Sequence, residues 1–325
     1  MEALKLIIDG SKKLKNNDIS SHQLDSEILM SKVLNVTREN LLTNLEKKID
    51  YSIAKDFHNL IYRRSKREPI AQILQKKEFW SKDFLINDKI LIPRPETELL
   101  VEKLLKVFKN KKLFILDIGT GSGCIILSML SELLNSNGIA LDISPHAIKL
   151  AQTNAIKHKL NHKVKFFRRS LNVIHDKKFD LIVSNPPYII RKDIKNLAID
   201  VKTYEPKLAL DGGNDGLDVI KKVIYKSKSI LKIKGMLALE IGNEQFKKVS
   251  TILKRNNFRV KHLVKDYRQN IRCILSVLEK WENLSFSSWT IIEEEISDLG
   301  HKKVTSEEGM VRSAQTEVVA SIMEI

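Results

Sequence analysis

The sequence contains no long apolar run, and this excludes several classes of protein at once. No uninterrupted apolar stretch in the 325 residues approaches the ~18 that a transmembrane helix needs. The apolar run before Asp9 is also shorter than the ~7–15-residue core of a secretory signal peptide. We therefore expect a globular protein of the cytoplasm.

Cysteine is scarce, and no metal-binding pattern is present. Cys124 and Cys273 are the two cysteines, and they lie far apart with no CxxC pair. We expect both thiols to stay reduced. The histidines do not fall at the spacing of metal ligands, as positions 146, 158, 162 and 175 show. The sequence therefore predicts no metal site.

Acidic residues are fewer than basic ones. The 56 Lys and Arg residues exceed the 40 Asp and Glu residues, which gives a net charge of +16. One interpretation is an anionic partner such as nucleic acid. The other is a lysine-rich composition, because the lysines are spread along the whole chain. Both interpretations stay open, so charge does not choose a substrate.

Glycine and proline are nearly absent from the first 75 residues, which favours helices there. The stretch "SHQLDSEILMSKVL" repeats apolar residues at helical spacing, with Leu24, Ile28, and Val33 or Leu34 on one side. We expect a helical N-terminal domain over residues 1–75. Residues 76–98 have a short-strand pattern with "NDK" as a turn, and predict a hairpin that links two domains.

Residues 99–280 alternate apolar strand patterns with amphipathic helix patterns. Examples are "LFILDIG" and "GIALDIS" for strands, and "PHAIKLAQTNAIKH" for a helix. This alternation predicts a doubly wound α/β sheet. Residues 281–325 are more acidic and contain no glycine loop of this type. We interpret them as an appended tail.

A glycine loop follows the first strand of this domain. "ILDIGTGSGCIIL" places Gly119, Gly121 and Gly123 between an apolar strand and an apolar helix, where glycine lets the backbone approach a ligand. Asp117 ends the strand, and Asp142 ends the next one at the place of a ribose-binding acid. An alternative is that the glycines only tighten the turn and that Asp142 caps the following helix.

The pattern D-x-G-x-G-x-G, with an acid ending the next strand, resembles the S-adenosylmethionine-dependent class I methyltransferases. That resemblance implies a mostly parallel seven-stranded sheet and S-adenosylmethionine as cofactor. It implies a cofactor site made of Asp117, Gly119, Thr120, Gly121, Ser122, Gly123, Asp142, Ser170 and Asn185.

The stretch "DLIVSNPPYII" ends a predicted strand in Asn-Pro-Pro-Tyr. Pro186 and Pro187 stop strand pairing and stiffen the loop. The lone pair of an amide or exocyclic amine nitrogen is delocalised, so such a nitrogen must be oriented toward a methyl donor. The side-chain oxygen of Asn185 and the carbonyl of Pro186 can accept its two N–H groups, and Tyr188 offers a flat aromatic wall. The alternative is a strand-end turn with a packed tyrosine.

Several further stretches stand in a fixed order around this motif: "REPIAQILQKKEFW", "LIPRPETELLVE", "YEPKLAL-DGGNDGL" and "DYRQNIRC". With the helical N-terminal domain, they resemble the bacterial peptide chain release factor glutamine N5-methyltransferases over residues 1–280. The resemblance implies the glutamine of the Gly-Gly-Gln motif in class I release factors as substrate. It implies that Asn185, Pro186, Pro187 and Tyr188 hold the glutamine amide, with no membrane association and no stable nucleic-acid binding.

The segment "IPRPETE" resembles the element of this family that lines the site between the two domains, which implies substrate-binding roles for Arg94 and Glu96. The alternative is a helix N-terminus, in which Pro95 suits the first turn and Glu96 and Glu98 favour its positive end. In "YEP", Glu205 is expected to border the pocket.

The chain departs from the family at "RRSLNV", where the family has a short acidic-aromatic segment beside adenine. Arg169 and Ser170 occupy those places here. Two other functions therefore stay open. One is an adenine-N6 methyltransferase on nucleic acid, and the other is a binding protein of the same fold with weakened catalysis.

Overall fold

The computed structural model describes residues 1–171 and 178–280. The chain divides into two compact units, 1–279 and 280–325, and the elements and the site described in this section all belong to the first. The tail expected at 281–325 and part of the "RRSLNV" stretch therefore lie outside the described residues. In the part that is described, no helix is long and apolar enough to cross a membrane.

Residues 1–75 form short helices around a core of their own, which includes Leu6, Phe57 and Ile61. The predicted apolar face of the second helix is confirmed only in part, because Leu24 is 45% exposed whereas Val33 and Leu34 pack partly buried against this core. That helix buries Asp25 and Ser26 instead, and both are satisfied by partners: Asp25 pairs with an arginine, and Ser26 donates to a backbone carbonyl. The helices are α1 (Ala3–Lys15), α2 (His22–Leu34), α3 (Arg38–Leu42), α4 (Tyr51–Ser65) and α5 (Ile70–Leu74).

A two-stranded antiparallel hairpin comes next, made of β1 (Lys76–Phe79) and β2 (Lys82–Leu85). Its turn is not the predicted "NDK", which lies after β2. The turn is Trp80–Ser81, whose φ angles of 52° and 54° are both left-handed. A two-residue hairpin turn with both residues left-handed has a twist that matches that of the strands. Gly or Asn usually occupies these two positions. The sequence therefore carried no turn signal at this position.

The seven strands of the main sheet have the order β5-β4-β3-β6-β7-β9-β8. Every neighbouring pair from β5 to β7 is parallel, whereas β9 pairs antiparallel with both β7 and β8. The expected doubly wound, mostly parallel sheet is confirmed. The strands are β3 (Phe114–Ile118), β4 (Asn137–Asp142), β5 (Val164–Arg168), β6 (Phe179–Ser184), β7 (Leu231–Glu240), β8 (Phe258–Lys265) and β9 (Ile271–Leu278).

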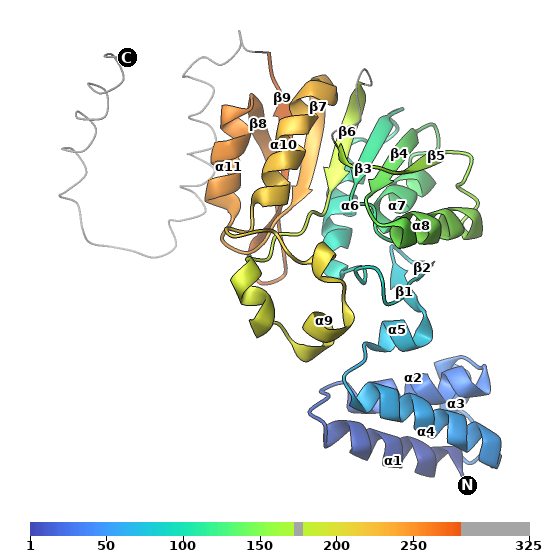
Figure 1. Ribbon diagram of the computed structural model, residues 1–325. Coiled ribbons are helices and arrows are strands. Elements are labelled where there is room, and N and C mark those ends of the chain that lie inside the picture. Colours follow the sequence, from blue (N-terminus) through green and yellow to red (C-terminus); the bar gives the residue numbers. More distant parts are fainter. Residues whose placement is uncertain (172–177, 281–325) are drawn as a thin grey trace, which may run out of the picture. The chain divides into compact units, whose positions relative to one another are not determined.

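Helices cover both faces of this sheet (Figure 1). One apolar core joins one face of the sheet to α6 and α7, and another joins the opposite face to α10 and α11. The order reverses between β3 and β6, so the carboxyl ends of those strands open a crevice where ligands bind in such folds. The helices are α6 (Pro95–Val107), α7 (Cys124–Glu132), α8 (Pro145–Lys157), α10 (Asp218–Ile230) and α11 (Phe246–Arg255).

An insertion lies between β6 and α10. It contains the short helices η2 (Arg191–Asn196), α9 (Ile199–Tyr204) and η3 (Lys207–Ala209). Its contacts with the helical N-terminal residues are polar. Arg64 donates to Asp25 and to Asp200, at 2.6 and 3.1 Å, and the hydroxyl of Tyr204 donates to the carbonyl of Lys66. These bonds connect the segment after the NPPY motif to α2 and α4.

Candidate active site

The glycine loop connects β3 to α7 at the carboxyl end of the sheet. Gly119, Gly121 and Gly123 all have left-handed φ angles, of 73°, 55° and 82°. A Cβ atom built at Gly119 or Gly121 would meet nothing within 4 Å, so open space lies beside the loop. A side chain at either position would adopt a strained backbone and fill that space. The loop is therefore shaped to receive a ligand against its backbone.

Asp117 is fully buried beneath this loop. Its Oδ2 accepts a hydrogen bond of 2.7 Å from the Thr120 hydroxyl, while its Oδ1 has no partner within the described residues. Burial raises the pKa of Asp117 to about 7, and the Thr120 hydroxyl opposes that shift. The buried Oγ of Ser122 likewise lacks a partner there. Buried polar atoms of this kind fit a ligand that brings donors to the loop.

Asp142 ends β4 and faces the same loop. Its Oδ2 accepts from the backbone N–H of Gly121 at 3.0 Å, and its Oδ1 accepts from that of Ser144 at 2.9 Å. Burial raises the pKa of Asp142, and these backbone donors oppose the shift. Each carboxylate oxygen retains a second lone pair, so the half-buried side chain can accept from two neighbouring hydroxyls of a ribose. These donors and acceptors fit S-adenosylmethionine.

The end of β5 lies next to Asp142, because Asp142 and Arg168 are register partners. The backbone N–H of Arg169 donates to the Asp142 carbonyl at 3.1 Å, and Ser170 comes after it as an exposed residue. Arg169 and Ser170 therefore lie on the Asp142 side of the crevice. A direct role for Ser170 stays a prediction.

The NPPY motif follows β6, the strand beside β3. Asn185 is half-buried, and its Nδ2 donates to the Thr97 hydroxyl oxygen at 3.3 Å. Thr97 donates in turn to Oε2 of Glu240 at 2.7 Å. Thr97 lies in the first turn of α6, and Glu240 ends β7, so three distant segments meet at this amide. Thr97 and Glu240 were missed in the sequence, since a polar residue at a strand end carries no sign of its burial.

Glu240 is almost completely enclosed, with 2% of its surface exposed. Burial raises its pKa to about 7. The Thr97 hydroxyl, the positive charge of Arg272 and the Asn185 amide oppose the rise, while the nearby charge of Glu96 adds to it. The Glu240 carboxylate is thus buried next to the NPPY motif, where Thr97 donates a hydrogen bond to it.

Tyr188 packs into a position that glycines keep open. A Cβ atom built at Gly212 would lie 2.8 Å from the Tyr188 backbone, and one at Gly242 would lie 3.0 Å from its ring. The side-chain amide of Gln245 donates to the Tyr188 carbonyl at 3.0 Å. Burial raises the pKa of Tyr188 to about 12, so the phenol stays neutral. The "DGG" and "EIG" stretches therefore serve to seat the tyrosine.

Arg94 and Glu205 meet in an ion pair, which connects "IPRPETE" to "YEP". The Nη2 of Arg94 donates to both carboxylate oxygens of Glu205, at 2.7 and 2.8 Å. The Glu205 side chain is only 1% exposed, and burial raises its pKa although Arg94 opposes the shift. Glu96 lies near enough to raise the pKa values of Tyr188 and Glu240. Pro95 opens α6, as the helix-terminus interpretation predicted.

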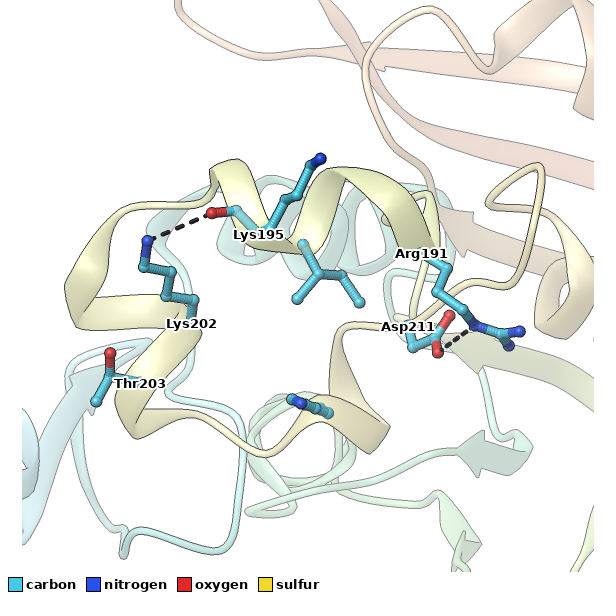
Figure 2. A pocket seen from close by; sticks show the side chains of 7 residues that line it. Arg191, Lys195, Lys202, Thr203 and Asp211 are labelled. Atoms are coloured by element: carbon cyan, nitrogen blue, oxygen red, sulfur yellow. Dashed lines mark hydrogen bonds and ion pairs between the residues drawn. The ribbon is translucent and has the colours of Figure 1, made fainter.

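A separate hollow of about 580 Å³ lies within the insertion. It is lined by Arg191, Ile194, Lys195, Lys202, Thr203, Lys207 and Asp211. Two of its cations already have partners, as Figure 2 shows: the Arg191 guanidinium pairs with Asp211, and the Lys202 ammonium donates to the Lys195 carbonyl. The Lys195 ammonium is directed away from the hollow (Figure 2). The arrangement does not resemble an anion site.

In residues 1–171 and 178–280, no three His, Cys, Asp or Glu side chains lie together in a group that could hold a metal ion. Cys124 and Cys273 are both free and buried. Burial raises the pKa of the Cys124 thiol to about 12 and that of Cys273 well above its usual value. Neither thiol is a nucleophile at neutral pH.

Two family matches cover much of the chain. Residues 5–74 match the family described as PrmC N-terminal domain, and residues 95–202 match the Methyltransferase small domain. The release factor glutamine methyltransferase of Clostridium acetobutylicum is 37% identical over 281 residues, which is 85% of this chain and 99% of that protein. The chain belongs to the release factor glutamine methyltransferase family.

Another group of relatives is longer. The bifunctional methyltransferase of Rickettsia conorii is 35% identical over 297 residues, which is 83% of this chain and 57% of that protein. This member of the release factor glutamine methyltransferase family thus spans little more than half the length of those relatives. Among solved structures, the catalytic domain of hMettl16, in complex with an RNA hairpin, shares the fold: the TM-score is 0.52 at 14% identity, over 67% of this chain and 82% of that one.

Proposed function

We propose that this protein transfers a methyl group from S-adenosylmethionine to the side-chain amide nitrogen, N5, of the glutamine in the Gly-Gly-Gln motif of class I peptide chain release factors. Family membership supports the reaction, and the site supports its chemistry. The observation that carries the proposal is the direction of the Asn185 amide. Its Nδ2 is committed to Thr97, so its Oδ1 is left to accept an N–H group of the substrate.

The cofactor lies against the glycine loop in this proposal. Asp142 accepts the ribose hydroxyls, the backbone from Gly119 to Gly123 lies along the ligand, and Asp117 supports the loop from below. When bound, S-adenosylmethionine supplies an electrophilic methyl group on a sulfonium. The residues at the end of β5, including Ser170, lie on the adenine side.

The substrate amide lies against the NPPY motif. Asn185 Oδ1 and the Pro186 carbonyl accept its two N–H groups, which turns the nitrogen toward the methyl donor. Tyr188 flanks the planar amide, and the prolines fix the direction of the carbonyl. One N–C bond would form as the C–S bond of the donor's methyl group breaks, which leaves a neutral thioether, and one N–H proton would then leave to solvent. Orientation and exclusion of water supply the catalysis, so no strong base is needed.

The remaining parts have assigned roles in this proposal. Residues 1–75 recognise the protein substrate, residues 76–98 connect that domain to the catalytic one, and residues 99–280 carry out the reaction. Arg94 and Glu96 border the substrate, with Arg94 held by its ion pair with Glu205. A release factor is a component of translation, so we place the protein in the cytoplasm. Stable binding of nucleic acid is not part of the proposal, despite the net charge of +16.

Mass spectrometry of a methylated substrate tests the proposal. Purified protein, S-adenosylmethionine and a class I release factor are incubated, and the Gly-Gly-Gln peptide is examined. A gain of one methyl group on the glutamine is the expected result. An unmodified glutamine, with calorimetry showing bound cofactor, would refute it. Parallel reactions with DNA and RNA oligonucleotides test the adenine-N6 alternative, and absence of cofactor binding would favour the binding-protein alternative.

A further inference from the structure

An asparagine that must accept a hydrogen bond has a problem of orientation. The oxygen and nitrogen ends of its amide have nearly the same shape, and rotation about the last side-chain bond exchanges them. If the amide nitrogen of Asn185 faced the substrate, its N–H groups would meet the N–H groups of the glutamine amide, and no hydrogen bond could form. Something besides shape must therefore keep the oxygen facing the glutamine.

The hydrogen bonds behind Asn185 have one consistent direction. The Thr97 hydroxyl has a single proton, which it donates to Oε2 of Glu240 at 2.7 Å. An ionised carboxylate can only accept, so the Thr97 oxygen is left with lone pairs facing Asn185. The Nδ2 of Asn185 donates to that oxygen at 3.3 Å. A flipped amide would set oxygen against oxygen here.

We propose that Thr97 and Glu240 are positioning residues, which hold the Asn185 amide with its oxygen toward the substrate. The proposal rests on the proposed function, because it assumes that Asn185 must accept from the glutamine amide. It assigns the terminus of β7 and the first turn of α6 a part in the reaction. Thr97 is 2% exposed and Glu240 is 2% exposed, so water does not compete for these bonds.

The arrangement depends on the charge of Glu240. A protonated Glu240 can donate to Thr97, and the Thr97 proton can then turn toward Asn185 and stabilise the flipped amide. The charged or titratable groups that act on Glu240 or respond to its charge are Glu96, Cys124, Tyr188, Arg272 and Cys273. The two thiols and the phenol stay neutral at pH 7 because burial raises their pKa values.

Kinetics of Thr97 variants form the main test. Thr97→Val keeps the shape and removes the hydroxyl, so kcat is expected to fall roughly tenfold or more, while the Kd of S-adenosylmethionine stays within about twofold. Thr97→Ser restores the hydroxyl and is expected to restore most of kcat. Ser276→Ala is the matched control, because Ser276 is a buried hydroxyl that donates to the Leu237 carbonyl. A folded Thr97→Val protein with the kcat of wild type would overturn the proposal.

Glu240→Gln tests the charge itself. The kcat of the wild type is expected to fall toward acid pH, as Glu240 becomes protonated. In Glu240→Gln this acid limb of the pH–rate profile is expected to be flat. The kcat of Glu240→Gln at pH 8 is expected to be lower than that of the wild type. Glu279→Gln is the control, since Glu279 is a buried carboxylate paired with Lys234 and Arg259 instead. The same acid limb in wild type and Glu240→Gln would contradict the role.

A measurement without turnover separates this proposal from the proposed function. The side-chain amide resonance of Asn185, assigned by its loss in Asn185→Asp, is expected to shift in Thr97→Val and to titrate with pH in wild type only. An unmethylated release factor together with these shifts would refute the function but not the positioning. A resonance that Thr97→Val leaves unchanged would refute the positioning, whatever the substrate.

Discussion

The side of the candidate site where we propose that the cofactor binds and the side where we propose that the substrate binds are assembled in different ways. On the cofactor side, the bonds are short-range: Thr120 to Asp117 spans three residues, and Gly121 to Asp142 spans 21. On the substrate side, Asn185 to Thr97 spans 88 residues, and Thr97 to Glu240 spans 143. The bonds on the cofactor side join one loop to its neighbouring strand. The bonds on the substrate side join distant segments, so they can form only after the sheet has formed.

This difference predicts that the two halves can be damaged independently. Changes near the glycine loop should lower cofactor affinity and leave the orientation of the glutamine intact. Changes behind Asn185 should lower the rate and leave cofactor affinity intact. Single substitutions on either side test that separation.

Asn185→Ala is expected to have the largest effect. In the proposed reaction this change removes an acceptor that orients the reacting nitrogen, so kcat should fall about 100-fold or more. The Kd of S-adenosylmethionine should change by about threefold at most, since the Asp142 acceptors remain. Steady-state kinetics and calorimetry measure the two quantities. Asn256→Ala is the control, because the Asn256 amide donates to a helix carbonyl on α11. Equal losses of rate and cofactor affinity would mean that the two halves are not separable.

Asp142→Ala should produce the opposite pattern. It removes an acceptor of charged hydrogen bonds, each worth about 1.5–3 kcal/mol, so the Kd of S-adenosylmethionine should rise roughly 10- to 100-fold. At saturating cofactor, kcat should remain near that of wild type. Asp180→Asn serves as the control, because Asp180 is a carboxylate of β6 that pairs with Lys232 instead. A kcat that stays low at saturation would show that Asp142 also shapes the substrate side.

Glu240→Gln should have a smaller effect, visible in stability. Burial raises the pKa of Glu240 from its usual 4.5 to about 7, so the folded state binds its proton more tightly than the unfolded state does. Glu240 therefore destabilises the fold as pH rises from about 4.5 to 7, by at most about 3 kcal/mol. Relative to wild type, Glu240→Gln should raise the melting temperature more at pH 8 than at pH 4.5. The same difference at both pH values would mean that the pKa of Glu240 is the same in the folded and the unfolded protein.

The sequence predicted what is encoded locally. The glycine loop, the strand-end aspartates and NPPY are contiguous signals, and the alternating strand and helix patterns predicted the sheet. Several such stretches in order predicted the family, and the family matches and relatives confirmed it. The cap of α3 is equally local, since the Thr37 side chain accepts from the backbone N–H of Asn40, three residues on.

The rest depends on tertiary burial, which a single sequence does not display. Glu240 reads as the polar end of a strand, and Thr97 as one residue in an acidic helix start, yet both are buried against Asn185. Leu24 was misplaced for the converse reason, because α2 buries paired polar groups and leaves that leucine outside. The Trp80–Ser81 turn was missed because neither residue favours a left-handed backbone.

The Trp80–Ser81 turn also places a fluorescent side chain where it can report on the seating of the hairpin. The Trp80 N–H donates to Glu98 on α6 at 3.1 Å, and its indole N–H donates to Glu132 on α7 at 3.2 Å. The chain has three tryptophans, and replacing Trp281 and Trp289 by phenylalanine leaves Trp80 as the sole tryptophan of the full-length protein, which can be excited selectively over the tyrosines. Its fluorescence then reports how the hairpin is seated on α6 and α7. Comparing its denaturation curve with that of the helical circular dichroism signal reveals whether the β1–β2 hairpin unfolds with the helices or before them.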